Sequence, residues 1–246
     1  MAFGSLGALG TGQNKTAGQT SFTITTSAVA EVGNIVIVKI ATDDCANVES
    51  DRTDYSVSDS AGNTYTRAKE YVHGKTTGLD GAQVGIFYSV VTTELASSGT
   101  ITISHPTTPT ARAASAWEFS KGAGTTLAVE QATHLTGDAA DPAAISLSSM
   151  TSREYLLLWA LATEGPATET TTQDADYTST GGNGTTGGGV ATNMRISGGY
   201  RIATLTADTV DASTSVARDH VQILVAIYEV GGAAEEIPIL VQARRL

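Results

Sequence analysis

Residues 154–162 read Glu-Tyr-Leu-Leu-Leu-Trp-Ala-Leu-Ala, an apolar run that lies between the turn-forming pairs at 152–153 and 165–166. The run is short, and apolar side chains occupy both of its alternations. A buried helix could show the same pattern, but the surrounding sequence is rich in Thr, Ser and Gly, which favours sheet. The run therefore predicts a β-strand that is buried on both faces.

The same arrangement occurs earlier in the chain. Residues 34–43 align with residues 155–164 at an offset of 121, and a Ser/Thr-rich segment precedes the apolar run in both places. Each half then closes on an apolar strand that contains one acidic residue, at 114–119 and at 223–229. We interpret this order as one β-motif used twice, in halves at about 19–122 and 123–230 that share one core.

The expected fold is all-β: a jelly-roll-like antiparallel β-sandwich at residues 19–230, built from the two related halves. A chain of 246 residues can hold two domains, but β-sandwiches of this length are often single domains. Residues 1–18 are rich in Gly, Ala and Thr without periodicity, and they predict an extended N-terminal arm rather than core. Residues 231–246 follow the last strand and predict an extended C-terminal arm.

Composition excludes several classes of protein. The net charge is −11, so we expect no nucleic-acid partner, because phosphate binding needs clustered Lys and Arg. No apolar run approaches the roughly 18 residues of a membrane span, and we expect no membrane insertion. Residues 1–11 lack the charged start and apolar segment of a signal peptide. Cys45 is the single cysteine, so no intrachain disulfide can form.

The acidic loop at 42–63 is the candidate for a metal site. Asp43, Asp44 and Asp59 could supply oxygen ligands to Ca²⁺. The spacing fits no EF-hand, however, and Asp and Asn are ordinary turn formers. We therefore expect no metal and no cofactor.

No catalytic motif is visible. The four histidines have no zinc-type spacing, and no nucleophile elbow occurs. Glu118 and Glu229 occupy equivalent positions in the two halves, which favours a structural role, for example as outward-facing residues, over a glycosidase pair. The Gly-rich segment at 180–189 has the composition of a flexible surface loop. We expect a protein that is not an enzyme.

Three tyrosines near loops are the candidate ligand residues: Tyr65, Tyr71 and Tyr177. An aromatic ring at a loop can stack on a sugar. Four other large aromatic side chains could also stack on a sugar, but three of the four lie within apolar alternation, so core packing is their expected role; they are Trp117, Trp159, Tyr88 and Tyr200.

Four stretches of sequence together resemble a known group of proteins: residues 33–41, 57–66, 85–91 and 114–120, the last reading Ala-Ser-Ala-Trp-Glu-Phe-Ser. The pattern is similar to β-sandwich structural proteins that occur in virions of tailed bacteriophages, often as minor tail proteins, and in some bacterial surface proteins. The resemblance covers about residues 20–230 and contains no catalytic signature. It implies a jelly-roll-like sandwich used for assembly or surface recognition.

The expected function is that of a non-enzymatic virion structural protein, in the tail or tail tip or as a capsid-decorating protein. The expected partners are other virion proteins, copies of the same chain and a host-surface glycan, and the expected location is the virion after synthesis in the host cytoplasm. The alternative is a carbohydrate-binding or cell-surface adhesion module.

The end of the chain is the expected assembly element. Pro238 prevents a continuous helix, and the flanking segment is apolar and extended. Such a segment can add to a sheet edge or lie in a groove of a neighbour. The residues expected to make these contacts are Ile237, Ile239, Leu240, Val241, Arg244 and Arg245.

Overall fold

The computed structural model describes residues 3–43, 48–74, 81–106 and 109–231. The chain is all-β, as the sequence predicts, and the described residues contain one short 3₁₀ helix, η1, at Val190–Thr192. The strands of the first half are β1 (Gly4–Asn14), β2 (Ser21–Thr25), β3 (Ile35–Thr42), β4 (Ser50–Asp51), β5 (Ser56–Asp59), β6 (Thr66–Gly74), β7 (Gly81–Val90), β8 (Thr100–Ser104) and β9 (Arg112–Ser120). Those of the second half are β10 (Thr126–Ala140), β11 (Ile145–Leu147), β12 (Arg153–Glu164), β13 (Thr171–Thr172), β14 (Thr178–Ser179), β15 (Asn183–Gly184), β16 (Met194–Leu205), β17 (Asp208–Val210), β18 (Ser213–Thr214) and β19 (Arg218–Val230).

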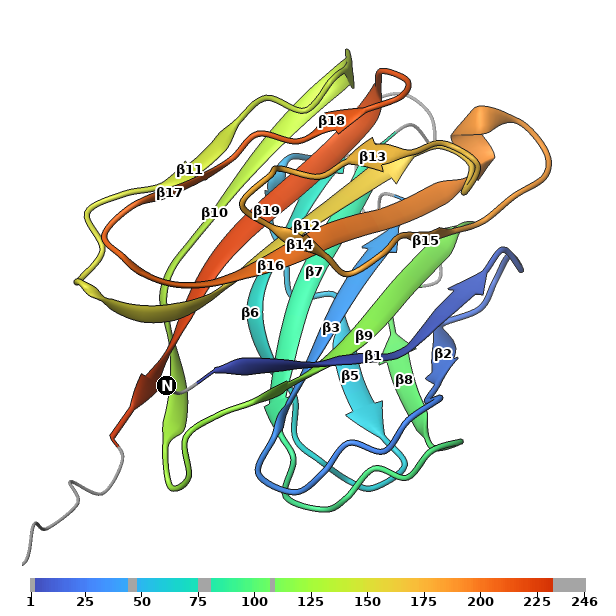
Figure 1. Cartoon of the computed structure of the whole chain (residues 1–246). Helices are drawn as coiled ribbons and strands as arrows, with labels where there is room; N and C mark the ends of the chain where they lie inside the picture. The colour runs from blue at the N-terminus through green and yellow to red at the C-terminus, as the bar shows by residue number, and fades with distance from the viewer. Residues whose placement is uncertain (1–2, 44–47, 75–80, 107–108, 232–246) are drawn as a thin grey trace, which may run out of the picture.

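Two large antiparallel sheets pack face to face (Figure 1). The first sheet has the order β1-β9-β3-β7-β6-β4 and takes all its strands from the first half. The second sheet has the order β10-β19-β12-β16-β14, with β15 paired to β16, and takes its strands from the second half. Four neighbouring strands follow the same pattern in both sheets. In the first sheet the order is β1-β9-β3-β7, and in the second it is β10-β19-β12-β16, where each strand takes the place of its counterpart: the first strand of the half, then the last, then the two central ones.

A smaller sheet covers the outer face of each large one. The sheet β2-β8-β5 packs on the first sheet, and the pair β11-β17 packs on the second. The chain therefore has four layers with three apolar interfaces between them. Packing on both sides of each large sheet explains why its central strand has no polar face.

The central strands show this double burial residue by residue. In β3, Ile35 and Ile37 face the second sheet, whereas Val36 and Val38 face β2-β8-β5. In β12, even-numbered residues such as Leu156 face the first sheet, and odd-numbered ones pack under β11-β17. The prediction of a strand buried on both faces is confirmed.

The prediction of an N-terminal arm is wrong for Gly4–Asn14. These residues form β1, which pairs along the whole of β9, and Leu9 is 1% exposed. Two register shifts interrupt the strand, so its inward-facing residues do not alternate regularly in the sequence. A Cβ at Gly12 would lie 2.2 Å from the carbonyl oxygen of Thr23, so close contact with β2 requires glycine there.

Two predicted loops also contain strands. The acidic segment at 42–63 includes β4 and β5, and β5 pairs with β8. The Gly-rich segment at 180–189 is docked rather than flexible: β15 pairs with β16, and the Asn183 amide donates to Gly12 O at 2.7 Å. The proposed assembly residues between Ile237 and Arg245 lie outside the described residues, as does Asp44.

Replacing Trp159 with alanine should lower the free energy of unfolding by about 3–5 kcal/mol. The Trp159 side chain is 0% exposed between β12 and β11-β17, and its Nε1 donates to Gln222 Oε1 at 2.9 Å. Urea denaturation of Trp159→Ala measures the loss, with Trp117→Ala as the control because Trp117 is only partly buried. Equal losses in the two variants would contradict this packing.

Candidate functional site

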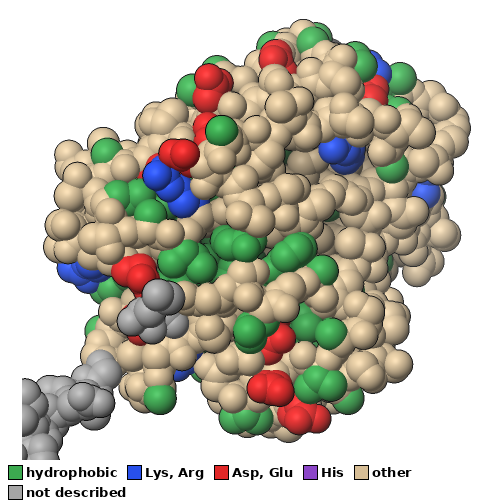
Figure 2. Space-filling view, viewed as in Figure 1, with side chains coloured by type: hydrophobic (Ala, Val, Ile, Leu, Met, Phe, Trp, Pro, Cys, Tyr) green, Lys and Arg blue, Asp and Glu red, His purple; other side chains and the backbone are tan. Residues whose placement is uncertain are grey.

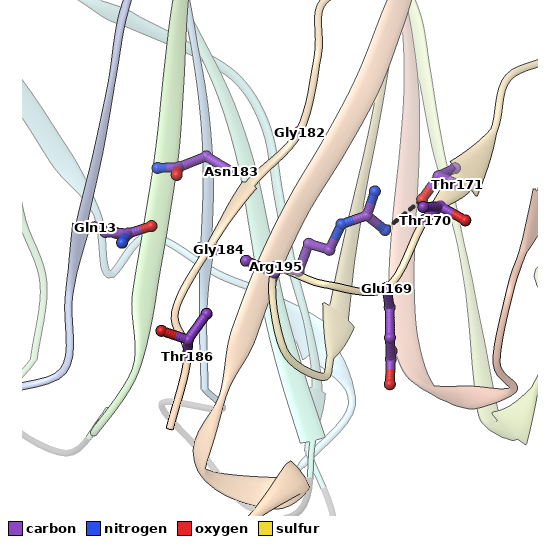
Figure 3. Close-up of a pocket in the computed structure, with 10 residues that line it drawn as sticks. Gln13, Glu169, Thr170, Thr171, Gly182, Asn183, Gly184, Thr186 and Arg195 are labelled. Carbon is purple, nitrogen blue, oxygen red and sulfur yellow. Dashed lines mark hydrogen bonds between the residues drawn. The ribbon is translucent and has the colours of Figure 1, made fainter. Parts of the chain in front are cut away.

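A polar pocket lies where the two halves of the chain meet (Figure 3). Its volume is about 480 Å³, within the range of roughly 300–1,000 Å³ common for ligand pockets. Strand β1 contributes Gln13 from the first half, and strands and connecting segments of the second half contribute the rest. The lining residues on β13, β15 and β16 are Thr171, Asn183, Gly184 and Arg195.

Asn183 fixes the strand β15 between the two sheets. Its amide nitrogen donates to Gly12 O at 2.7 Å and to Ala114 O at 3.3 Å, so it joins β15 to β1 and β9. Gly184 follows, and a Cβ there would lie 3.0 Å from Met194 O, which explains the small residue beside β16. These contacts give the pocket a wall that depends on both halves.

Arg195 supplies the charge of the pocket. The residue is 8% exposed, and its Nη1 donates to Thr171 Oγ1 at 2.6 Å. No carboxylate in the described part of the chain lies within ion-pair distance of Arg195, because Glu169 pairs with Arg218 instead. Burial lowers the pKa of Arg195 from its usual value, but arginine stays charged at neutral pH.

A second pocket, of about 320 Å³, lies between β7 and the start of β10. Thr66, Tyr88, Ser89, Thr126 and Leu127 are among its lining residues. None of the described lining residues is charged. The pocket of Arg195 is therefore the better candidate for binding a polar ligand.

The three candidate tyrosines do not come together. Tyr65 donates to Asp59 Oδ2 at 3.0 Å, and Tyr71 stacks on His134 with ring centroids 3.5 Å apart. Tyr177 is buried and donates to Asp208. Each ring packs in or against a different apolar interface, so the structure assigns them packing and hydrogen-bonding roles rather than a shared ligand site.

Two of the candidate calcium ligands, Asp43 and Asp59, accept hydrogen bonds from backbone N–H groups of connecting segments. Asp43 is buried, and its Oδ2 accepts from the backbone N–H groups of Thr110 and Ala111 at 3.1 and 3.0 Å. Asp59 accepts from Ala61 N at 2.9 Å in the following turn. Within the described ranges, no group of three or more His, Cys, Asp or Glu side chains is arranged to hold a metal ion.

Glu118 and Glu229 also hold turns. Glu118 Oε1 accepts from Glu31 N at 2.9 Å, and Glu229 Oε1 accepts from Gly122 N at 2.6 Å. Each contact ties a closing strand to a turn of the same half or to the link between the halves. Glu118 is only 7% exposed, so its expected outward orientation is wrong, because its carboxylate turns back to the chain.

His73 forms an ionisable group of residues that the sequence analysis missed. Its Nδ1 contacts Glu49 Oε1 at 2.6 Å, and its Nε2 contacts Asp138 Oδ1 at 2.8 Å. Both ring nitrogens therefore contact carboxylates. The contacts join β6 to β10 and so link the two halves; no local motif signals them, because the three residues lie far apart in sequence.

Lys39 is a buried amine between the two large sheets. It is 2% exposed, and its Nζ donates to Thr180 Oγ1. Burial lowers the pKa of the amine from 10.5 to about 7. A lysine with this pKa is a frequent feature of catalytic sites, but Lys39 lines none of the pockets described above, and its neighbours are the packed strands β3 and β16.

The variant Lys39→Met should raise the free energy of unfolding at pH 7 by about 1–3 kcal/mol, because it removes a buried polar group with one partner. In the wild type the folded pKa is about 7 and lies below the unfolded value. Between these two values the unfolded chain binds more protons, so wild-type stability rises with pH there. The difference in free energy of unfolding between Lys39→Met and the wild type should therefore decrease as the pH rises from 7 to 10.

Denaturation at several pH values from 7 to 10 measures this difference. Lys69→Met is the control, since the Lys69 side chain is partly exposed and pairs with Asp51. An advantage of Lys39→Met that stays constant over the whole range would contradict the buried, easily deprotonated amine.

The described residues include no helix with the length and apolar character that a membrane span requires. Comparison of the chain with protein-family models, with curated proteins and with solved structures gives no match.

Proposed function

We propose that the chain is a non-enzymatic structural protein of a tailed-phage virion, in the tail or tail tip or as a capsid-decorating protein. The observation that carries this proposal is the use of buried and half-buried acidic side chains. Asp43, Glu118 and Glu229 each accept hydrogen bonds from backbone N–H groups. These groups stiffen turns and strand ends, which suits a rigid assembly unit.

We also infer that each half is a jelly-roll-like unit and that the two halves are related. In the first half, the strands β1-β9-β3-β7 form one sheet and β2-β8-β5 the facing one. The second half repeats β10-β19-β12-β16 opposite β11-β17. The chain passes several times between the two facing sheets, as it does in a jelly roll, although β3 and β4, and β6 and β7, follow one another within one sheet.

The surface suits an assembled protein. Charged residues make up 16% of the chain, below the usual roughly 25%. On the face in Figure 2, charged side chains are few and lie among hydrophobic side chains and the tan backbone and uncharged polar groups. Contact with other virion proteins or with copies of the same chain then requires little desolvation of charge. The net charge of −11 disfavours direct contact with the packaged nucleic acid.

The segment after β19 is the proposed contact with a neighbour. Strand β19 ends at Val230, close to the start of the described chain (Figure 1). Ile237, Ile239, Leu240 and Val241 follow in sequence, and an apolar segment of this kind gains free energy when a neighbour covers it. Arg244 and Arg245 could then meet the acidic surface of a neighbouring copy.

Deleting residues 231–246 should abolish incorporation into particles while leaving the melting temperature of the monomer unchanged. The reason is that the two large sheets and their covering sheets are complete before residue 231. Incorporation is measured by complementation of a phage that lacks the gene, and stability by thermal denaturation. A full-length variant with Ile237, Ile239 and Leu240 changed to Ser separates tail chemistry from tail length and should fail likewise. A truncated chain that is incorporated normally but melts earlier would contradict the proposal.

A carbohydrate-binding or adhesion module is the second candidate function. The pocket beside Arg195 favours it, because its lining is polar and includes the side chains of Gln13, Thr170 and Thr186. Binding of the whole chain to a panel of immobilised glycans tests this function directly, and absence of binding would exclude it.

A further inference from the structure

We propose that the pocket beside Arg195 binds the carboxylate of an acidic sugar residue. The proposal rests on the second candidate function, that the chain binds glycans, and it names the ligand class and the residue that selects it. It is independent of the virion role.

The guanidinium of Arg195 has one edge free to bind a ligand. Its Nη1 donates to Thr171 Oγ1, the contact drawn in Figure 3. Its Nε and Nη2 donate to no acceptor among the residues that the structure describes, and neither is sealed from solvent. Two adjacent N–H donors on one plane match the two oxygens of a carboxylate.

Gly182 keeps this edge open. A Cβ at position 182 would lie 3.2 Å from Nη2 and 3.6 Å from Nε of Arg195. A side chain there would crowd the edge of the guanidinium that carries Nε and Nη2. Glycine at 182 therefore leaves this edge less obstructed than any other residue would.

The charge balance of the pocket favours an anion. Glu169 also lines the pocket, but Arg218 neutralises it through contacts to Oε1 at 3.0 Å and Oε2 at 3.2 Å from Nε. Arg195 forms no ion pair in the described ranges, and Glu169 acts on it only as a nearby charge. A guanidinium that is nine-tenths buried without a counter-ion costs free energy, and a ligand carboxylate offsets that cost.

The remainder of the lining suits a hydroxylated ligand. Gln13, Thr170 and Thr186 contribute an amide and hydroxyl groups, and none of the described lining residues is aromatic. A planar base or an apolar ligand would therefore find no stacking partner, whereas sugar hydroxyls can exchange hydrogen bonds with these groups. The combination of one charged edge and a polar, uncharged remainder indicates a sugar acid.

NMR titration of the full chain with sodium D-glucuronate tests the site, with D-glucose and sodium acetate as matched probes. Glucuronate should shift the amide resonances of residues 182–184 and 195. It should bind at least about ten-fold more tightly than either probe, because glucose lacks the carboxylate and acetate lacks the sugar hydroxyls. Acetate binding as tightly as glucuronate would overturn the proposal, since the pocket would then select no sugar.

Two variants assign the binding to the named residues. Arg195→Gln should weaken glucuronate binding by about ten-fold or more, because it removes the charged pair of donors. Gly182→Ala should weaken binding while the charge is retained. Gly189→Ala is the control in the same segment, since a Cβ there meets no atom within 4 Å and the backbone φ of −71° suits alanine.

Melting temperatures and the dispersion of the amide spectrum establish that each variant is folded. Unchanged glucuronate binding in Gly182→Ala and Arg195→Gln would refute the site. If the chain still bound glycans in that case, the second candidate function would survive without this pocket. If no glycan bound at all, both the sugar-acid site and the second candidate function would be refuted.

Discussion

The two-sided burial of the central strands β3 and β12 is the constraint on which the structure depends. Each strand presents apolar side chains on both faces, and each face must be covered. Either large sheet therefore needs the other on its inner side and a small sheet on its outer side. The four layers follow from this requirement, and the interface between the large sheets contains residues from both halves of the chain.

Several polar side chains make hydrogen bonds between the first and the second half of the chain, at the seam where the two halves meet. Lys39 lies between the sheets, His73 bridges β6 and β10, and Asn183 bonds across to β1 and β9. The hydrogen bonds of these side chains are directional, so they favour one docking of the two halves. Apolar packing alone is non-directional. The pocket of Arg195 opens at this seam, so its shape depends on the correct docking of the two halves.

The sequence predicts the parts of the fold that have a local period. Runs such as 154–162 predict strands, and acids such as Asp59 predict turns. The sequence does not predict strand β1, because its bulges break the alternation of apolar and polar residues. The offset of 121 between the halves does give a signal for this strand, since it maps the start of β10 onto residue 5. The site escapes for a different reason: Gln13, Asn183 and Arg195 come from separate segments that only the tertiary fold brings together.

The most direct test of the shared core is the behaviour of residues 1–122 expressed alone. This fragment contains the whole first sheet, but it leaves side chains such as Ile35, Ile37 and Val84 without the second sheet that covers them. The account predicts that the fragment aggregates or shows no cooperative thermal unfolding. A soluble, monomeric fragment that melts cooperatively would contradict it, because the first half would then be a domain in its own right.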